Sequence, residues 1–321
     1  MNRNVIDYFD SMIMPLIQDK HNNILKDANI MILGSVGLGI DDGFSDMEAV
    51  IYLPQQIWRK YGGKLQLDLN KKISETNLWK KEGSIICVHP LSWLLDGNGE
   101  KIMSNVENIP WNDISFESLF TIQENLIYYD SNDNLNKIKK ITAESEMPEY
   151  IWKKEIIIRL KDTLECLNEL YQFKNRNKYD EAQIPLGKII EYFFQMGFLI
   201  CHRYYPWRTH YSWAFKKLPQ SFSKLCSDIN LLSSTTEWKI KIEMIEKIIY
   251  EYKNNIAIKN IIPEIDIRKK ELVEELIWAE RLESWNNPNW KEFINKRIEK
   301  AIIEGYAEDQ FWIWSLWGLD S

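Results

Sequence analysis

A short stretch near the N-terminus, Ile30–Leu53, constrains the fold of this chain more than any other part of the sequence. It consists of an apolar run, a Gly-Ser pair, a loop rich in glycine and aspartate, and a second apolar run. A run of roughly 4–8 apolar residues between turn residues is typical of a β-strand. The stretch therefore predicts two strands, Ile30–Leu33 and Ala49–Leu53, with a loop between them.

Two carboxylates, Asp46 and Glu48, stand at the start of the second predicted strand. Side chains two positions apart on a strand point to the same face, so both carboxylates can bind one cation. Gly34-Ser35 ends the preceding strand, where free backbone N–H groups can bind an anion. Together these features predict metal-assisted chemistry on a nucleoside triphosphate. The alternative is a β-hairpin with solvated acids, since Asp42-Gly43 is itself a common hairpin turn.

The pattern resembles the nucleotidyltransferase superfamily typified by DNA polymerase β, in which a Gly-Ser pair precedes an acidic pair on a strand. The resemblance implies that Gly34 and Ser35 bind the triphosphate and that Asp46 and Glu48 bind Mg²⁺. Because a charge inside an apolar strand is costly without a partner, we favour this interpretation over the hairpin.

A third carboxylate usually lies on a neighbouring strand in that superfamily, as general base or metal ligand. The next predicted strand here, Ser84–His89, contains no acid. Glu82 precedes this strand and His89 ends it, and both residue types accept protons near neutral pH when their surroundings favour it. Glu82 is the candidate catalytic residue, with His89 as the alternative. In the ordinary interpretation, Glu82 is a solvated residue of a turn and His89 only ends a strand.

Composition limits the function further. With 321 residues the chain is long enough for two domains. Its net charge of −7 argues against a large electrostatic interface with DNA or RNA. No apolar run approaches the roughly 18 residues that span a membrane, and the N-terminus does not resemble a signal peptide. The four cysteines and four histidines form no zinc signature. We expect a cytoplasmic protein with reduced cysteines.

Hydrophobic periodicity predicts an α+β fold with two domains. Residues 1–140 form an α/β domain on a small mixed sheet, which begins with a helix over residues 3–20 and includes the strand LIYYD at 126–130. The resemblance implies that this is the nucleotidyltransferase domain. Residues 141–321 form an α-helical domain. A polar stretch at roughly 131–147 is the linker candidate, and Pro148 at a helix start opens the second domain. Apolar residues recur every three or four positions in four helical segments of that domain, 149–173, 182–202, 236–261 and 266–284. A further helix to about Ile303 and a buried apolar tail, FWIWSLW, complete it.

Three segments extend the resemblance to a little-characterised bacterial family that joins a nucleotidyltransferase domain to a helical C-terminal domain. These are GLGIDDGFSD, LIYYDSNDNL and RYYPWRTHYSWAFKKLP, which occur in this order. The similarity covers about residues 5–220. Two positions depart from the family: its loop ends Asp-His-Asp where this chain has Asp46-Met47-Glu48, and it has Lys-Trp at Thr209-His210.

The two-domain plan is also similar to that of the adenylyltransferases that inactivate aminoglycosides and lincosamides. In those enzymes the drug contacts acids and aromatics of the helical half. The analogy implies acceptor contacts from Asp180, Glu181, Trp207 and Trp213. It implies triphosphate contacts from Arg203, Arg208 and Lys216. Helix packing and a solvated surface are the ordinary roles of these residue types.

The sequence thus predicts an Mg²⁺-dependent nucleotidyltransferase that moves AMP from ATP to a hydroxyl group of a small molecule. A catalytically inactive nucleotide-binding or regulatory protein is the alternative, because the third strand has no acid. An RNA-modifying transferase is a third hypothesis, disfavoured by the acidic charge. The expected partners are a nucleoside triphosphate and a small acceptor. The helical half has enough apolar surface to form a homodimer, although no residue pattern specifies one.

Overall fold

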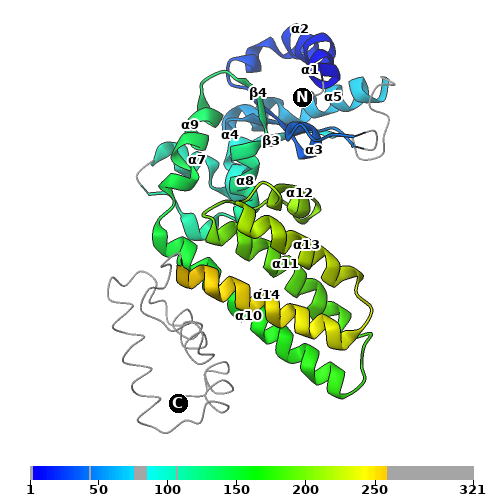
Figure 1. Cartoon of the computed structure of the whole chain (residues 1–321). Coiled ribbons are helices and arrows are strands. Elements are labelled where there is room, and N and C mark those ends of the chain that lie inside the picture. Colours follow the sequence, from blue (N-terminus) through cyan, green and yellow to red (C-terminus); the bar gives the residue numbers. More distant parts are fainter. Residues whose placement is uncertain (1–2, 43–44, 76–84, 106–107, 259–321) are drawn as a thin grey trace. The chain divides into compact units, whose positions relative to one another are not determined.

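The computed structural model describes residues 3–42, 45–75, 85–105 and 108–258, and it divides into two compact units, Met1–Met147 and Pro148–Ser321 (Figure 1). Among the described residues, strands occur only in the first unit, and the second unit is helical. The predicted α+β fold is therefore confirmed. No helix in these ranges is long and apolar enough to cross a membrane.

The first unit is built on a mixed sheet with the strand order β3-β2-β1-β4. The central strand β1 (Asn29–Leu33) pairs antiparallel with β2 (Glu48–Leu53) and with β4 (Leu126–Asp130). β2 pairs in parallel with β3 (Ile85–Pro90). All four predicted strands are present, and their ends lie within one residue of the prediction.

One face of this sheet forms the core of the unit. Alternate residues of three strands pack on the helical turns α1 (Arg3–Tyr8), η1 (Phe9–Ile13) and α2 (Met14–Leu25), and on α5 (Gly63–Glu75). The predicted N-terminal helix is thus confirmed. Buried strand residues of this cluster are Ile30, Ile32, Ala49, Ile51, Leu53, Ile86 and Val88. Because successive strand residues point to opposite faces, the residues between them lie on the other face.

The outer edge of β3 is closed by side chains. Gln66 of α5 donates from Nε2 to the carbonyl of Ile86 (2.7 Å), and its Oε1 accepts from the N–H of Val88 (2.7 Å). The indole of Trp58 donates to the carbonyl of Val88 (2.9 Å). An edge strand leaves alternate N–H and C=O groups unpaired, and unpaired backbone groups away from water are costly. These bonds therefore stabilise β3 in its register.

We expect Gln66→Ala to lower the free energy of unfolding by about 1–3 kcal/mol, because two backbone groups of β3 lose their partners. Urea unfolding of the purified protein measures this change. Leu67→Ala is the matched control on the same helix, since the Leu67 side chain is 70% exposed and surface substitutions stay within about 0.5 kcal/mol. Equal effects of the two substitutions would contradict this role of Gln66.

Short helices complete the first unit. They are α3 (Gly34–Gly37), α4 (Gln55–Ile57), η2 (Trp58–Gly62), η3 (Leu91–Trp93), α6 (Leu94–Gly97), α7 (Gly99–Ser104), η4 (Trp111–Asp113), α8 (Phe116–Glu124), α9 (Asn134–Ile141) and η5 (Glu144–Glu146). Helix α9 lies in the segment that was predicted to be a polar linker, and its Leu135 and Ile138 are fully buried. That prediction is wrong because these two apolar residues, three positions apart, bury one face of an otherwise polar helix.

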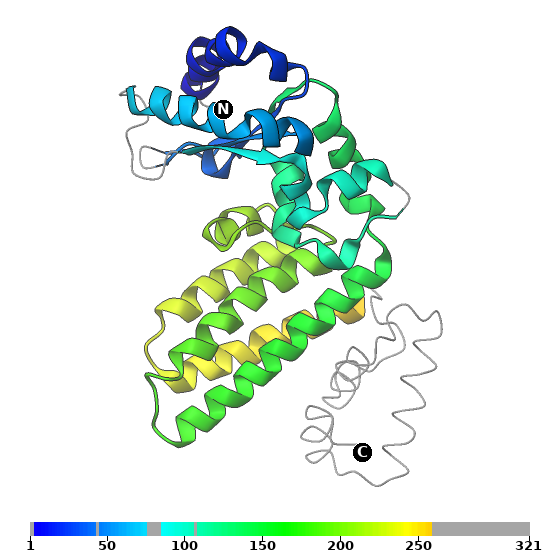
Figure 2. The same ribbon diagram turned by 180° about the vertical axis from the view of Figure 1, so that it is seen from behind.

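The second unit is a bundle of long helices that lie side by side (Figure 2). They are α10 (Glu149–Asn175), α11 (Gln183–Ile200), α13 (Gln220–Ser234) and α14 (Trp238–Ile258), with the short η6 (Arg208–His210) and α12 (Tyr211–Phe215) between α11 and α13. The predicted helices at 149–173, 182–202 and 236–261 are confirmed in the described residues. The predicted helix at 266–284, the helix to Ile303 and the tail FWIWSLW lie outside them.

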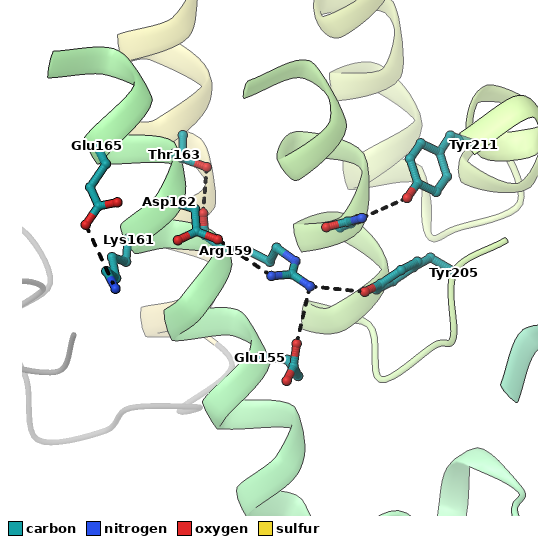
Figure 3. A network of polar contacts seen from close by, with 9 residues as sticks. Glu155, Arg159, Lys161, Asp162, Thr163, Glu165, Tyr205 and Tyr211 are labelled. Carbon is teal, nitrogen blue, oxygen red and sulfur yellow. Dashed lines mark hydrogen bonds and ion pairs between the residues drawn. The ribbon is translucent and has the colours of Figure 1, made fainter. Parts of the chain in front are cut away.

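A polar network inside the second unit ties the aromatic segment after α11 to α10 (Figure 3). The guanidinium of Arg159 lies 3.5 Å from the carboxylate of Glu155, 3.7 Å from that of Asp162 and 3.4 Å from the hydroxyl of Tyr205. Burial raises the pKa of both Glu155 and Asp162. The Tyr205 ring meets Tyr211 edge to face. Part of this aromatic segment therefore packs inside the bundle.

Candidate active site

The acidic pair lies on the face of the sheet opposite the core. Met47, between the two acids, is fully buried in the core cluster, so Asp46 and Glu48 on either side of it point to the other face. The N–H of Ile85 donates to the carbonyl of Met47 (2.8 Å), which extends the pairing with β3 over this position. Glu48 is exposed and Asp46 is partly exposed. The structure therefore brings the two carboxylates together at an accessible strand end.

The electrostatics of the pair suit a divalent cation. Burial raises the pKa of Glu48, and the negative charge of Asp46 raises that pKa further. In the part of the chain that the structure describes, no lysine, arginine or histidine forms an ion pair with either carboxylate. Two neighbouring carboxylates without a protein cation are the oxygen donors that Mg²⁺ binds. The residues present thus fit such an ion.

Gly34 brings the backbone directly beside this pair. Leu33, the last residue of β1, pairs with Glu48, and Gly34 then turns into α3 with φ +62°. A Cβ at Gly34 would lie 3.1 Å from Oε2 of Glu48. Both the left-handed conformation and the close approach favour glycine. Ser35 follows, and its hydroxyl has no hydrogen-bond partner among the described residues, so this hydroxyl can bind a ligand.

The loop before Asp46 is held by a local turn. The hydroxyl of Ser45 donates to the Asp42 carboxylate (3.0 Å) and accepts from the Asp42 N–H (3.0 Å). The Ser45 N–H donates to the Asp42 carbonyl (3.2 Å). Such side-chain bonds to the neighbouring backbone are typical of tight turns. These bonds hold the turn that leads to Asp46. Gly43 lies outside the described residues.

The third strand places a thiol, not a carboxylate, beside the acidic pair. Glu48 pairs with Ile85, and Val50 pairs with Cys87, so Ile85, Cys87 and His89 share the face of Glu48. Burial raises the pKa of the Cys87 thiol, and the charge of Glu48 raises it further. Within the described ranges, no three His, Cys, Asp or Glu side chains are arranged to hold a metal ion. Cys87 was not predicted as a site residue. Because it stands two positions before His89, it lies on the same face of the strand as His89.

Of the two residues predicted as a general base, the structure describes only His89. Glu82 lies outside the described residues. His89 pairs with Tyr52, and the four residues from Glu48 to Tyr52 span about 13 Å along the strand. A general base must lie within hydrogen-bond reach of the proton that it accepts. His89 therefore does not serve a hydroxyl held at Asp46 and Glu48, which corrects that alternative.

The residues predicted to contact the acceptor do not form one cluster. Asp180 and Glu181 precede α11, whereas Trp207 follows it, and this helix of 18 residues is roughly 27 Å long. Asp180 and Trp207 thus flank opposite ends of α11, and their contact with an acceptor stays a prediction. Glu181 forms an ion pair with Lys178 (3.1 Å).

The aromatic and cationic residues after α11 divide into two groups. Tyr204 and Tyr205 are buried, whereas Trp207 and the predicted triphosphate contacts Arg203, Arg208 and Lys216 are exposed. The ammonium group of Lys217 lies 3.5 Å from the centroid of the Trp213 ring. Packing thus accounts for the two tyrosines, while the exposed cations remain predicted ligand contacts.

Comparisons with known proteins give limited matches. A family model described as a domain of unknown function (DUF4037) matches residues 111–214, which run from η4 to α12. No protein with a curated description matches the chain. The crystal structure of a nucleotidyltransferase-like protein from Exiguobacterium sibiricum 255-15 is similar with a TM-score of 0.36 and 10% sequence identity, over 82% of this chain and 81% of that chain. A likeness this weak does not define function, so we argue function from the site itself.

Proposed function

We propose that this chain is a nucleotidyltransferase that moves AMP from ATP to a hydroxyl group of a small molecule. The observation that carries this proposal is the acidic pair, Asp46 and Glu48, which lies at an accessible strand end and forms no ion pair with a cation among the described residues. Gly34 lies directly beside it, and Ser35 follows Gly34 with a hydroxyl that has no partner in the part of the chain that the structure describes. A small acceptor suits the net charge of −7 better than a nucleic acid does.

Each residue of the site has a role in this reaction. Asp46 and Glu48 hold Mg²⁺, which when bound would neutralise the triphosphate and lower the pKa of the attacking hydroxyl. The Ser35 hydroxyl and the nearby backbone N–H groups orient the terminal phosphates. Because Gly34 has no side chain, a phosphate can approach the carboxylates closely.

We expect ATP to bind the wild type only in the presence of Mg²⁺, and we expect the double variant Asp46→Ala, Glu48→Ala to lose this binding. Isothermal titration calorimetry with and without Mg²⁺ measures both. The double variant Asp7→Ala, Glu75→Ala is the matched control, since it removes two exposed acids from the same unit. Absence of metal-dependent binding in the wild type would overturn the proposal.

A nucleotide-binding protein without turnover is the second candidate. The observation that favours it is β3, whose site face carries Ile85, Cys87 and His89 and no acid. Pyrophosphate release separates the two candidates. An active enzyme releases pyrophosphate from ATP when hydroxyl compounds are added, whereas an inactive protein binds Mg²⁺-ATP without releasing it.

A further inference from the structure

The segment that follows α11 carries positive charge in a chain that is acidic overall. No aspartate or glutamate lies between Glu191 and Asp228 in the sequence. The cations inside this interval are Arg203, Arg208, Lys216, Lys217 and Lys224. The whole chain, by contrast, has a net charge of −7. A cluster of one sign of charge raises the local concentration of ligands of the opposite sign, so this segment favours a negatively charged ligand.

Buried aromatic residues hold the backbone of this segment against the bundle. The hydroxyl of Tyr211 accepts from Nε2 of Gln195 on α11 (2.8 Å), and the hydroxyl of Tyr205 accepts from the guanidinium of Arg159 on α10 (3.4 Å) (Figure 3). Phe215, one turn after Tyr211, is fully buried. The segment is therefore fixed at several points, and its exposed side chains project from a defined backbone.

Helix α12 has a buried side and a cationic side. Its buried residues are Tyr211, Ala214 and Phe215. Residues three and four positions apart lie next to each other on a helix surface, so Lys216 and Lys217 lie next to Trp213. The two lysines are exposed and Trp213 is half-buried. The side of α12 away from the core thus combines an indole with two ammonium groups.

The turn before α12 adds a second indole and a guanidinium. Trp207 precedes η6 and is 62% exposed, whereas its neighbour Pro206 is buried. The N–H of His210 donates to the carbonyl of Trp207 (2.9 Å) and closes this turn. In the ranges that the structure describes, neither Arg208 nor Lys216 forms an ion pair with a carboxylate. We define the basic aromatic surface as Trp207, Arg208, Trp213, Lys216 and Lys217.

The length of the basic aromatic surface fits a short stretch of one nucleic acid strand. Helix α12 follows η6 without a break, and at about 1.5–2.0 Å per residue the run from Trp207 to Lys217 is roughly 15–20 Å long. Nucleotides of one strand are spaced by about 3.4 Å, so the run spans about five of them. A net charge of −7 opposes a large interface with nucleic acid and not a contact with a few phosphates.

We propose that the basic aromatic surface binds a single-stranded nucleic acid. Trp207 stacks on a base, and Arg208, Lys216 and Lys217 contact phosphates, which is how proteins bind single strands without reading their sequence. An acidic protein segment would match the charges but would offer the exposed indole no base to stack on. This binding requires neither Mg²⁺ nor the acidic pair of the first unit, so it goes beyond the proposed function and is tested separately from it.

Fluorescence anisotropy with a labelled oligouridine in EDTA tests the stacking contact. Trp207→Ala should weaken the binding of the oligouridine by about 10-fold, because one base loses its stacking partner. The same variant should bind heparin, a polyanion without bases, as tightly as the wild type does. Tyr250→Ala is the matched control on α14, where the Tyr250 side chain is 58% exposed, and it should change neither ligand.

The salt dependence of binding tests the phosphate contacts. The double variant Arg208→Ala, Lys216→Ala should lower the slope of log K against log salt concentration by about 1.4, since each phosphate contact with a single strand contributes about 0.7. It should also weaken the binding of heparin. The matched control is Lys239→Ala, Lys247→Ala, which removes the same charge from exposed positions of α14 and should leave the slope unchanged.

Loss of oligouridine binding in the variants of the basic aromatic surface alone would support the proposal. A wild type that does not bind oligouridine would overturn it. Equal weakening in the α14 variants would also overturn it, because any exposed cation would then suffice. If Trp207→Ala bound oligouridine as tightly as the wild type while the double variant lost oligouridine and heparin alike, the partner would be a polyanion without bases, and the assignment to nucleic acid would be wrong.

Discussion

Asp46→Ala should lower the rate of AMP transfer by about 100- to 1000-fold, which is the effect of removing one group that stabilises charge in a transition state. The substitution removes one of the two carboxylates that hold Mg²⁺, and Glu48 alone does not replace it. Pyrophosphate release from Mg²⁺-ATP with a hydroxyl acceptor measures the rate. A variant with the full rate would show that the acidic pair is not the reacting site.

The same substitution should leave the fold intact. Burial raises the pKa of Glu48, and like-charge repulsion from Asp46 raises it further, so the removal of Asp46 takes away an unfavourable interaction of the folded state. We therefore expect the free energy of unfolding of Asp46→Ala to equal or exceed that of the wild type. Urea unfolding measures it, and Asp46→Asn provides the variant closest in shape. Loss of both activity and stability would indicate a structural role for Asp46.

Gly37→Ala should lower the free energy of unfolding by about 3 kcal/mol, at the upper end of the effects of overpacking. A Cβ at this position would lie 2.0 Å from the carbonyl oxygen of Ile32 and 2.6 Å from Oδ1 of Asn125. Ile32 cannot move away easily, because β1 pairs with strands on both sides. The substitution should therefore separate α3, which carries Ser35, from the end of β1. Urea unfolding measures this loss.

Gly63→Ala is the matched control for this prediction. Gly63 begins α5 in the same unit, and a Cβ there would meet no atom within 4 Å. Alanine favours helix more than glycine does, so Gly63→Ala should raise the free energy of unfolding by about 0.5–1 kcal/mol. If the two alanine variants were equally stable, the close approach of α3 to β1 would not constrain the fold.

The strands were predictable because each is a compact apolar run between turn residues. Helix α13 was not predicted, although its buried Phe222, Leu225 and Ile229 recur at spacings of three and four. The linker prediction failed at α9 because a mostly polar segment needs few apolar residues to pack as a helix. Local composition thus predicts where strands form better than it predicts which polar segments fold.

The acidic pair could be predicted because residues two positions apart, such as Asp46 and Glu48, lie on the same face of any β-strand. Cys87 could not, since its relation to Glu48 depends on the parallel register of β2 and β3. Long-range pairing, which the sequence alone does not display, decides which side chains meet.

The closed edge of β3 also affects how copies of this protein can associate. Open edges recruit strands from other chains, and this recruitment is a common route to domain swapping and fibrous aggregates. At β3 an incoming strand would first have to displace Gln66 and Trp58 from Ile86 and Val88. Copies of the chain therefore do not join by continuing the sheet there. The edge strand beside the proposed nucleotide site is thus shielded from other polypeptides, while Glu48 at the start of β2 remains exposed to small molecules.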